Sequence, residues 1–322
     1  MFENINMKSE ITEAYNRIHP HIRYTPLIKA NAISELLQAN VYLKLENIQI
    51  THSFKLRGAF NKLLVMPQEI RERGVIAASS GNHGAAVSYA CRQLGVTAKI
   101  FVPNTVPATK LEAIKLYGAE VLIYGDDAGI TEQYAREQAA VQGVEYISPY
   151  NDIAVICGQG TIGYELYMQL PEMDEIYIAV GGGGLISGIA SYLKAVNAKI
   201  KTVGCLPENS PAMYECIKAG KMVEVEITPT LSDGTAGNND LDSITLDFCQ
   251  RYVDAYQLTT EAEIKAAMRM LLAKEHLLVE GSVGVALAAL LQNKNRVLNK
   301  NIVVVVCGGN ISLNTLQKVI CD

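Results

Sequence analysis

Short apolar runs alternate with longer amphipathic stretches along almost the whole chain. Such runs predict buried strands, and apolar residues at helical spacing predict the helices between them. The clearest strands are expected at residues 41–45, 75–78, 99–102, 121–124, 176–180, 202–206 and 302–306. Near-continuous apolar strands are typical of parallel sheets that helices cover on both faces. The pattern therefore predicts an α/β protein with doubly wound parallel sheets.

Length and composition indicate more than one domain. The chain has 322 residues, of which 49% are hydrophobic, and this exceeds what one compact core usually holds. No Pro- or Ser-rich linker divides the sequence. We therefore expect two domains whose boundary lies inside the regular alternation of strands and helices.

Charge and cysteine usage exclude several partners. The net charge is -5 and the basic residues are scattered, so we expect neither nucleic acid nor an anionic membrane as a partner. Residues 1–10 lack the apolar segment of a secretory signal, and no run approaches the length of a membrane span. The seven cysteines form no Cys-x-x-Cys pair and are expected to be free thiols. These features predict a cytoplasmic protein that acts on a small molecule.

One lysine stands out as a potential nucleophile. Lys55 follows Ser53, a good N-cap residue, and precedes a helical pattern. The positive end of a helix dipole and the neighbouring Arg57 would both favour the neutral amine. A lysine with a lowered pKa is the type that forms Schiff bases with carbonyl groups. The alternative is a solvated lysine at an ordinary helix start.

A polar turn follows the expected strand 75–78. It comprises Ser79, Ser80, Gly81, Asn82, His83 and Gly84, and a helical pattern over residues 85–94 comes next. A strand, turn and helix start of this kind directs amide and hydroxyl groups at one spot, which suits a small carboxylate or phosphate. An ordinary capped turn would have the same composition.

Two glycine-rich segments also follow strands. Gly181, Gly182, Gly183 and Gly184 lie between the strand 175–180 and a helix at 185–195, which predicts a phosphate cradle. The second segment is Cys307, Gly308, Gly309 and Asn310, which ends the strand 302–306 and is expected to open another helix. Its thiol or amide could face the edge of a ring.

Two further patterns are weaker. Residues 158–163 fit Gly-x-Gly-x-x-Gly after an apolar run at 153–157, but the next strand ends in glycine with no acid for a ribose hydroxyl. NAD is therefore not expected. His19 and His21 flank Pro20 with no acid or thiol nearby, so a loop pair is favoured over a metal site.

In their order, Lys55, the serine-asparagine turn, the four glycines and the late Cys-Gly-Gly-Asn resemble pyridoxal-phosphate enzymes of the tryptophan synthase beta-subunit fold, or fold type II. The segment 53–59 is similar to the version in threonine/serine dehydratases and serine racemases. The segments 44–47, 158–162, 232–234 and 280–281 agree with dehydratases. The resemblance covers nearly the whole chain. It implies a large domain of residues 1–71 plus 151–322, an inserted small domain of residues 72–150, a cofactor in the cleft between them, and a homodimer.

The resemblance also implies roles for individual residues. Lys55 and Ser80 would be catalytic, with pyridoxal 5'-phosphate attached to Lys55. The cofactor would contact Phe54, Lys55, Asn82, Gly181, Gly182, Gly183, Gly184, Gly234, Glu280 and Cys307. The hydroxy-amino-acid substrate would contact Ser79, Ser80, Gly81, Asn82 and His83. No metal is expected, because Leu206 and Ala212 align with the acidic metal ligands of racemases, and a displaced site at Glu208 is the alternative.

The implied reaction is the elimination of water from L-threonine or L-serine, which yields 2-oxobutanoate or pyruvate and ammonia. Cys307 would face the pyridine nitrogen, where other pyridoxal folds use an aspartate. A thiol does not hold a full positive charge on the ring, so prompt loss of the β-hydroxyl is favoured over a long-lived carbanion. Ser80 keeps serine racemisation open, and 3-hydroxyaspartate dehydration is a further alternative. A catalytically silent amino-acid-binding protein is the non-enzyme alternative, against which the intact Lys55, Ser80 and Asn82 stand.

Overall fold

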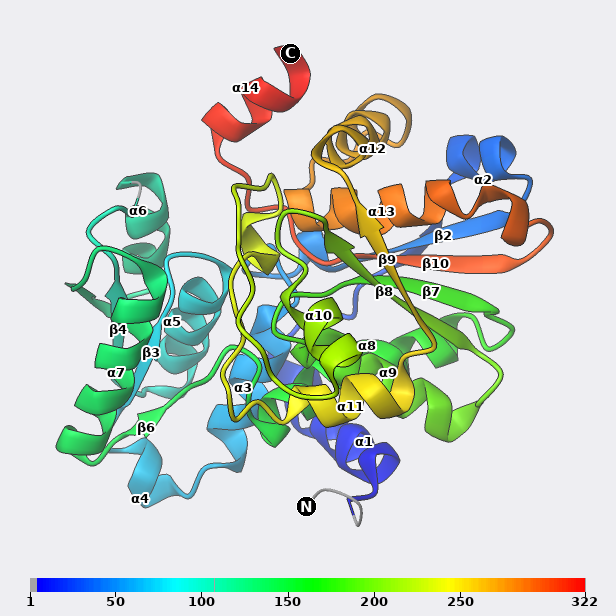
Figure 1. The fold of residues 1–322 in the computed structure, drawn as a ribbon. Coiled ribbons are helices and arrows are strands. Elements are labelled where there is room, and N and C mark those ends of the chain that lie inside the picture. The colour runs from blue at the N-terminus through cyan, green and yellow to red at the C-terminus, as the bar shows by residue number, and fades with distance from the viewer. Residues whose placement is uncertain (1–4, 107, 322) are drawn as a thin grey trace.

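Two β-sheets in two lobes organise the molecule (Figure 1). The structure is a computed structural model that describes residues 5–106 and 108–321. The larger sheet has six strands in the order β1-β2-β10-β7-β8-β9, and the smaller has four in the order β5-β4-β3-β6. Helices cover both faces of the larger sheet, with α12 and α13 on one side and α1, α8 and α9 on the other. The predicted α/β class with two doubly wound domains is confirmed.

The strands largely follow the apolar runs. The larger sheet contains β1 (Leu27–Lys29), β2 (Asn40–Leu45), β7 (Glu175–Ala179), β8 (Lys201–Pro207), β9 (Ala255–Thr259) and β10 (Asn301–Val306). The smaller contains β3 (Val75–Ala78), β4 (Ala98–Val102), β5 (Glu120–Ile123) and β6 (Glu145–Tyr146). The short β1 and β6 and the half-buried β9 had no apolar run to predict them. All four strands of the smaller sheet lie within residues 72–150, and those two domain boundaries stay a prediction.

Strand pairing is parallel with one exception. β10 pairs in parallel with β2 and β7, so Val303 lies opposite Tyr42 and Ile176. Edge strand β1 instead pairs antiparallel with β2, with Leu27 opposite Lys44. The expectation of purely parallel sheets is therefore wrong at this edge, where a short connection through α2 reverses the chain direction.

The helices are α1 (Met7–Ile18), α2 (Asn31–Leu37), α3 (Lys55–Val65), α4 (Gln68–Arg71), α5 (Asn82–Leu94), α6 (Ala108–Leu116), α7 (Ala128–Gln142), α8 (Ile153–Gln169), α9 (Gly184–Val196), α10 (Ala212–Ala219), α11 (Thr245–Tyr252), α12 (Glu261–Lys274), α13 (Gly281–Gln292) and α14 (Leu313–Cys321). No helix in the described part of the chain is long and apolar enough to cross a membrane.

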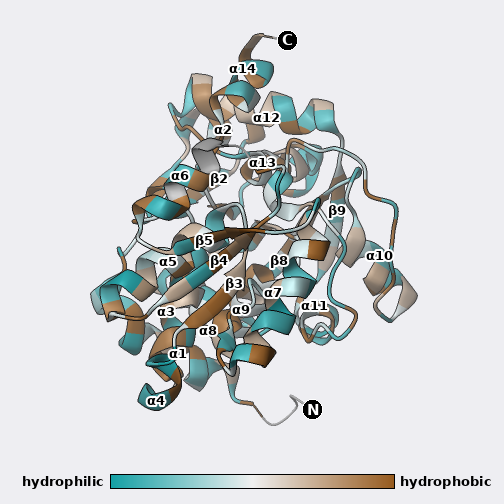
Figure 2. Ribbon diagram, turned by 90° about the vertical axis from the view of Figure 1, so that its left-hand side faces the viewer, coloured by the Kyte–Doolittle hydropathy of each residue, from teal (hydrophilic) through white to brown (hydrophobic). Residues whose placement is uncertain are grey.

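The core lies where strands are covered on both faces. The residues of β10 from Ile302 to Val306 have no exposed surface, and β3 is buried throughout. Figure 2 shows the buried β3 largely in brown, whereas teal collects on α4 and α7. Removing this apolar surface from water is the main force that stabilises the two domains.

The dinucleotide-like glycines lie inside a helix. The apolar run 153–157 forms the first turns of α8 after its N-cap Asp152. A Cβ at Gly158 would lie 2.6 Å from the backbone oxygen of Arg57, and one at Gly160 would lie 3.0 Å from that of Gly188. These glycines therefore permit close packing of α8 against α3 and α9, and they form no phosphate-binding turn.

The two histidines of the loop pair and most of the cysteines are packed against other side chains. His21 stacks on Phe60 and His19 on Tyr15, with ring centroids 5.0 and 5.7 Å apart. Among the described residues, no three His, Cys, Asp or Glu side chains gather in a way that could hold a metal ion. The seven cysteines of the described chain are free thiols, and six of them are buried.

Candidate active site

The helix that carries Lys55 begins differently from the prediction. Lys55 is the first residue of α3, and the N-cap position belongs to Phe54 rather than to Ser53. Ser53 forms a β-bridge with Gly308, and the amide of Phe54 donates to the carbonyl oxygen of Cys307 at 3.0 Å. This pairing holds Ser53 in extended backbone one residue too early to cap the helix. Its buried hydroxyl has no hydrogen-bond partner among the described residues.

The Lys55 amine is a potential nucleophile. Its Nζ donates to the carbonyl oxygen of Pro149 at 2.9 Å and lies 5.2 Å from the centre of the Phe54 ring. Burial lowers the pKa of Lys55 to about 8, although the negative charges of Glu280 and Glu132 oppose this. The direction agrees with the prediction, but the part of the shift assigned to Arg57 is wrong. Arg57 does not act on the amine, because its charge is paired with Glu46 and Glu165.

The serine-asparagine turn meets the start of α13. Asn82 is the first residue of α5, and its Nδ2 donates to Oε2 and Oε1 of Glu280 at 2.9 and 3.2 Å. Its Oδ1 accepts from Nδ2 of Asn310 at 2.6 Å. Within the turn, the amide of Gly81 donates to Oγ of Ser79 at 3.1 Å. The orientation of the Asn82 amide is therefore set from two distant points of the chain.

His83 lies beside this turn in a neutral form. Its Nε2 is 2.8 Å from the carbonyl oxygen of Ile147. Burial, together with the positive charge of Lys55, lowers the pKa of His83 to about 3. His83 consequently offers no positive charge to a substrate carboxylate.

Cys307 lies at the end of β10 in a short chain of hydrogen bonds. Its Sγ donates to Oγ of Ser282 at 3.2 Å, and that hydroxyl donates to Oε1 of Glu280 at 2.7 Å. Burial and the charge of Glu280 raise the pKa of the Cys307 thiol, which stays protonated. The predicted helix at Asn310 is wrong, since α14 begins only at Leu313.

The four glycines connect β7 to α9. Gly183, with φ of +84°, is the N-cap of α9, and a Cβ at Gly182 would lie 2.4 Å from the ring of Tyr150. The first intrahelical hydrogen bond runs from the amide of Ser187 to Gly183 at 2.9 Å. The preceding amides point out of the helix start, which is an arrangement that binds phosphate.

Gly234 and Tyr150 join these parts. A Cβ at Gly234 would lie 3.6 Å from Oε1 of Glu280, and one at Gly181 would lie 3.0 Å from Cα of Thr235. Tyr150, which packs on the glycine loop, follows the Pro149 that accepts from Lys55. A cavity of about 220 Å³ adjoins this region and is lined by Leu231, Asp233, Glu280, Gly281, Asn310, Ile311, Ser312 and Thr315.

Sequence reasoning missed three of the neighbours in this site. Asn310 was part of a quoted motif, and Ser282 lies two residues after Glu280, so adjacency to a motif was a usable signal. Tyr150 had no such signal. Its place follows from the glycine loop, on which its ring packs.

Comparisons with known proteins agree with this geometry. A family model described as pyridoxal-phosphate dependent enzyme matches residues 18–308. L-threonine ammonia-lyase of Thermotoga maritima is 37% identical over 311 residues, which are 97% of this chain and 77% of that protein. A threonine deaminase of Solanum lycopersicum has a TM-score of 0.94 at 32% identity, over 99% of this chain and 93% of that one. Maize serine racemase has a TM-score of 0.90 at 32% identity, over 97% and 95% of the two chains.

The residues fit pyridoxal 5'-phosphate. The cofactor needs an amine for its aldehyde, a cradle for its phosphate and polar groups at its ring edge. Lys55 has the lowered pKa, the glycine loop leaves amides free ahead of Ser187, and Asn82 and Cys307 lie within one hydrogen-bonded group. By this fit and by the family match over residues 18–308, the chain belongs to the family of pyridoxal-phosphate-dependent enzymes.

Proposed function

We propose that this protein is a pyridoxal-phosphate-dependent ammonia-lyase that converts L-threonine to 2-oxobutanoate and ammonia, and L-serine to pyruvate and ammonia. The observation that carries the proposal is the Lys55 amine, whose pKa is lowered to about 8 beside Glu280 and Cys307. The threonine ammonia-lyase of Thermotoga maritima, similar over 97% of this chain, supports threonine as the substrate.

We assign the cofactor contacts as follows. Lys55 would bind the aldehyde, the amides of Gly181, Gly182, Gly183 and Gly184 the phosphate, Asn82 the ring oxygen and Cys307 the ring nitrogen, with Phe54 and Gly234 on the two ring faces and Glu280 at the ring edge. When bound, pyridoxal phosphate supplies a carbonyl for the substrate amine and an electron-withdrawing ring that acidifies the α C–H bond.

The protein's own groups then position the substrate and move its proton. Ser79 Oγ already accepts from the amide of Gly81, so its own hydrogen is free to donate to the substrate carboxylate. Asn82, Ser80 and His83 would complete this side of the substrate. Nζ of Lys55, neutral once its proton is lost, is the base for the α proton. Orientation of the substrate by one turn lowers the activation free energy by several kcal/mol. Ideal alignment lowers it by about 7 to 11 kcal/mol.

The thiol favours elimination. Because burial raises the pKa of Cys307, the group stays neutral and does not stabilise a full positive charge on a ring nitrogen. A ring that withdraws electrons weakly favours prompt departure of the β-hydroxyl. The α proton and the β-hydroxyl leave the substrate together as one molecule of water. Hydrolysis of the unsaturated product then releases ammonia and the 2-oxo acid.

Serine racemisation is the second candidate. It needs an acid on the face of the α carbon opposite Lys55, and Ser80 is the hydroxyl available for that role. The likeness to maize serine racemase, with a TM-score of 0.90, favours testing it. Because a single methyl group discriminates substrates by only about 1 to 3 kcal/mol, both amino acids should be tested.

The test measures 2-oxo acid release from L-threonine, L-serine and 3-hydroxyaspartate by cofactor-loaded protein, with chiral analysis of the remaining serine. We expect 2-oxobutanoate from threonine and none from a Lys55→Ala control. D-serine without 2-oxo acid would establish the racemase instead. Release from 3-hydroxyaspartate alone would contradict the proposed substrate class.

We also propose a cytoplasmic homodimer with a small domain of residues 72–150. Two-fold dimers are the commonest symmetric assembly, and free cysteines suit a reducing compartment. Light scattering of the purified holoenzyme tests the dimer, and limited proteolysis near residues 72 and 150 tests the boundaries.

A further inference from the structure

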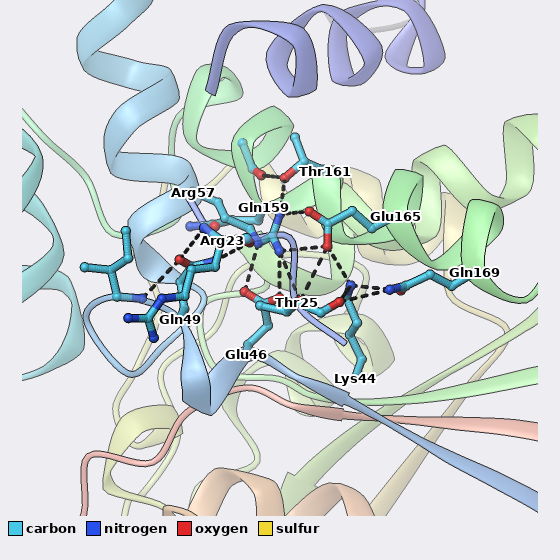
Figure 3. A network of polar contacts seen from close by, with 12 residues as sticks. Arg23, Thr25, Lys44, Glu46, Gln49, Arg57, Gln159, Thr161, Glu165 and Gln169 are labelled. Carbon is cyan, nitrogen blue, oxygen red and sulfur yellow. Dashed lines mark hydrogen bonds and ion pairs between the residues drawn. The ribbon is translucent and has the colours of Figure 1, made fainter. Parts of the chain in front are cut away.

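Three motifs from the sequence remain outside the site described above. They are the segment 44–47, the Arg57 of the lysine motif, and the segment 158–163. Figure 3 shows that their polar side chains meet in one network. Its four charged members are Lys44, Glu46, Arg57 and Glu165, which we call the buried charge cluster.

Arg57 is the centre of this cluster. Its Nε and Nη2 donate to the two carboxylate oxygens of Glu46, both at 2.8 Å. Its Nη1 and Nη2 donate to the two oxygens of Glu165 at 2.7 and 3.0 Å, and Nη1 also donates to Thr161 at 3.1 Å. Two bidentate pairs use the planar fork of arginine in a way that a lysine could not reproduce.

Lys44 completes the charge balance. Its Nζ donates to Oε2 of Glu165 at 2.5 Å and to the carbonyl oxygen of Thr25 at 2.8 Å. The side chains of all four cluster members have no exposed surface. These members carry two positive and two negative charges, so the cluster is neutral. An unbalanced charge at such a depth would be strongly destabilising.

The cluster pins the start of α3 from two sides. Glu46 follows β2, whereas Glu165 and Thr161 belong to α8. Beside Arg57, the amide of Gly58 donates to Oε1 of Gln159 at 3.1 Å. A Cβ at Gly58 would lie 2.3 Å from Nε2 of the same glutamine, so the two helices are in close contact at this point. The backbone of the first turn of α3, which carries Lys55, has little freedom to move.

Arg57 and Lys55 are two residues apart on one helix, and residues at that spacing do not face each other. The charges that act on Lys55 come from other elements, Glu280 before α13 and Glu132 on α7, and the neutral Cys307 after β10 and His83 on α5 also lie near the amine. The influence of Arg57 on the amine therefore passes through the helix backbone and not through its charge.

We propose that Arg57 is a positioning residue for Lys55, because it anchors the first turn of α3 to β2 and α8 through paired, charge-balanced carboxylates. The inference rests on the proposed role of Lys55 as the residue that binds the cofactor. The proposal gives a role to polar residues of the segments 44–47 and 158–163 and to Arg57 of the lysine motif, which have no assigned role in the candidate site.

The test variant replaces the planar guanidinium group of Arg57 and keeps a positive charge at that position. In Arg57→Lys, we expect the apo-protein to take up pyridoxal 5'-phosphate about tenfold more slowly, measured by the absorbance change on binding. We expect kcat for 2-oxobutanoate release to fall by a similar factor with KM for threonine within about twofold of the parent. The pH at half-maximal uptake rate should stay unchanged, because the cluster stays neutral.

Two control variants separate positioning from general loosening. Leu63→Ala removes a fully buried side chain from the same helix without touching the cluster, and it should lower thermal stability while cofactor uptake stays at the parental rate. Arg269→Lys replaces an arginine on α12 that donates to carbonyl oxygens of Val319 and Ile320 on α14, outside the cluster, and it should change neither quantity.

Three results would overturn the proposal. They are parental uptake in folded Arg57→Lys, equal slowing in Leu63→Ala, and a shifted pH midpoint in place of a slower rate. If Arg57→Lys does not fold, the same measurements on Glu46→Gln test the proposal. We expect cofactor uptake to be about two- to threefold slower in Glu46→Gln, and uptake at the parental rate would contradict the proposal. Uptake by the parent without 2-oxo acid release would contradict the proposed function alone.

Discussion

Asn82 donates to both carboxylate oxygens of Glu280, at 2.9 and 3.2 Å, across a separation of 198 residues. Asn82 begins α5, which follows a strand of the smaller sheet, and Glu280 precedes α13, which packs on the larger sheet. The pair therefore joins the two lobes beside Lys55. Burial raises the pKa of Glu280, and the hydrogen bonds from Asn82 and Ser282 oppose that effect.

Glu280→Gln should lower the pH at which Lys55 reacts. The negative charge of Glu280 holds the pKa of Lys55 up against the effect of burial. A neutral glutamine removes that support, so the pKa should fall below about 8 and cofactor uptake should reach half its maximal rate at a lower pH. Stopped-flow absorbance between pH 6 and pH 10 checks this, and an unchanged or higher midpoint would contradict it.

Cofactor uptake by the parent should accelerate with pH. The neutral amine is the nucleophile, and the pKa of Lys55 is lowered to about 8. Below pH 7 the uptake rate should drop about tenfold per pH unit, and above pH 9 it should level off. The same stopped-flow measurement in Lys55→Ala is the control and should show no uptake of this kind. A midpoint near 10.5, the ordinary value for lysine, would refute the lowered pKa.

Gly182→Ala should weaken cofactor binding. The new Cβ would lie 2.4 Å from the Tyr150 ring, so either the loop or the tyrosine must move, at a cost of about 1 to 3 kcal/mol. We expect about 5- to 150-fold weaker affinity for pyridoxal 5'-phosphate by absorbance titration. Gly129→Ala is the matched control. Its Cβ would meet only a carboxylate oxygen of Asp127 at 3.3 Å, so affinity should be unchanged.

Ser80→Ala should separate elimination from racemisation. If the Ser80 hydroxyl is the acid opposite Lys55, D-serine formation should vanish while 2-oxobutanoate release falls by no more than about fivefold. Chiral chromatography and a coupled 2-oxo acid assay on the same samples measure both. Loss of elimination to the same extent as racemisation would assign Ser80 to substrate binding. Ser79→Ala provides the comparison for loss of a hydroxyl from the same turn.

Local patterns in the sequence were sufficient for most elements. Apolar runs such as 302–306 predicted strands because a strand buried on both faces needs apolar residues throughout. The apolar run 153–157 was not assigned to a strand, since a short apolar run before glycine has the same composition in a strand and in a buried helix, and the structure places it in α8. The pattern did not predict β1 and β6, which are held by pairing with longer neighbours.

The sequence by itself identified the family, because the order of its motifs resembles that of pyridoxal-phosphate enzymes: Lys55, Asn82, the four glycines and Cys307. Only the tertiary structure decided which residues the side chains of these motifs bind. Ser53 is drawn from a helix cap into a bridge with Gly308, and Arg57 is turned from the amine into a cluster with Glu46 and Glu165. Capping preference and charge act between neighbours in sequence, whereas burial and pairing depend on which distant segments pack together. The second set is energetically larger in a buried site, and so it overrides the first.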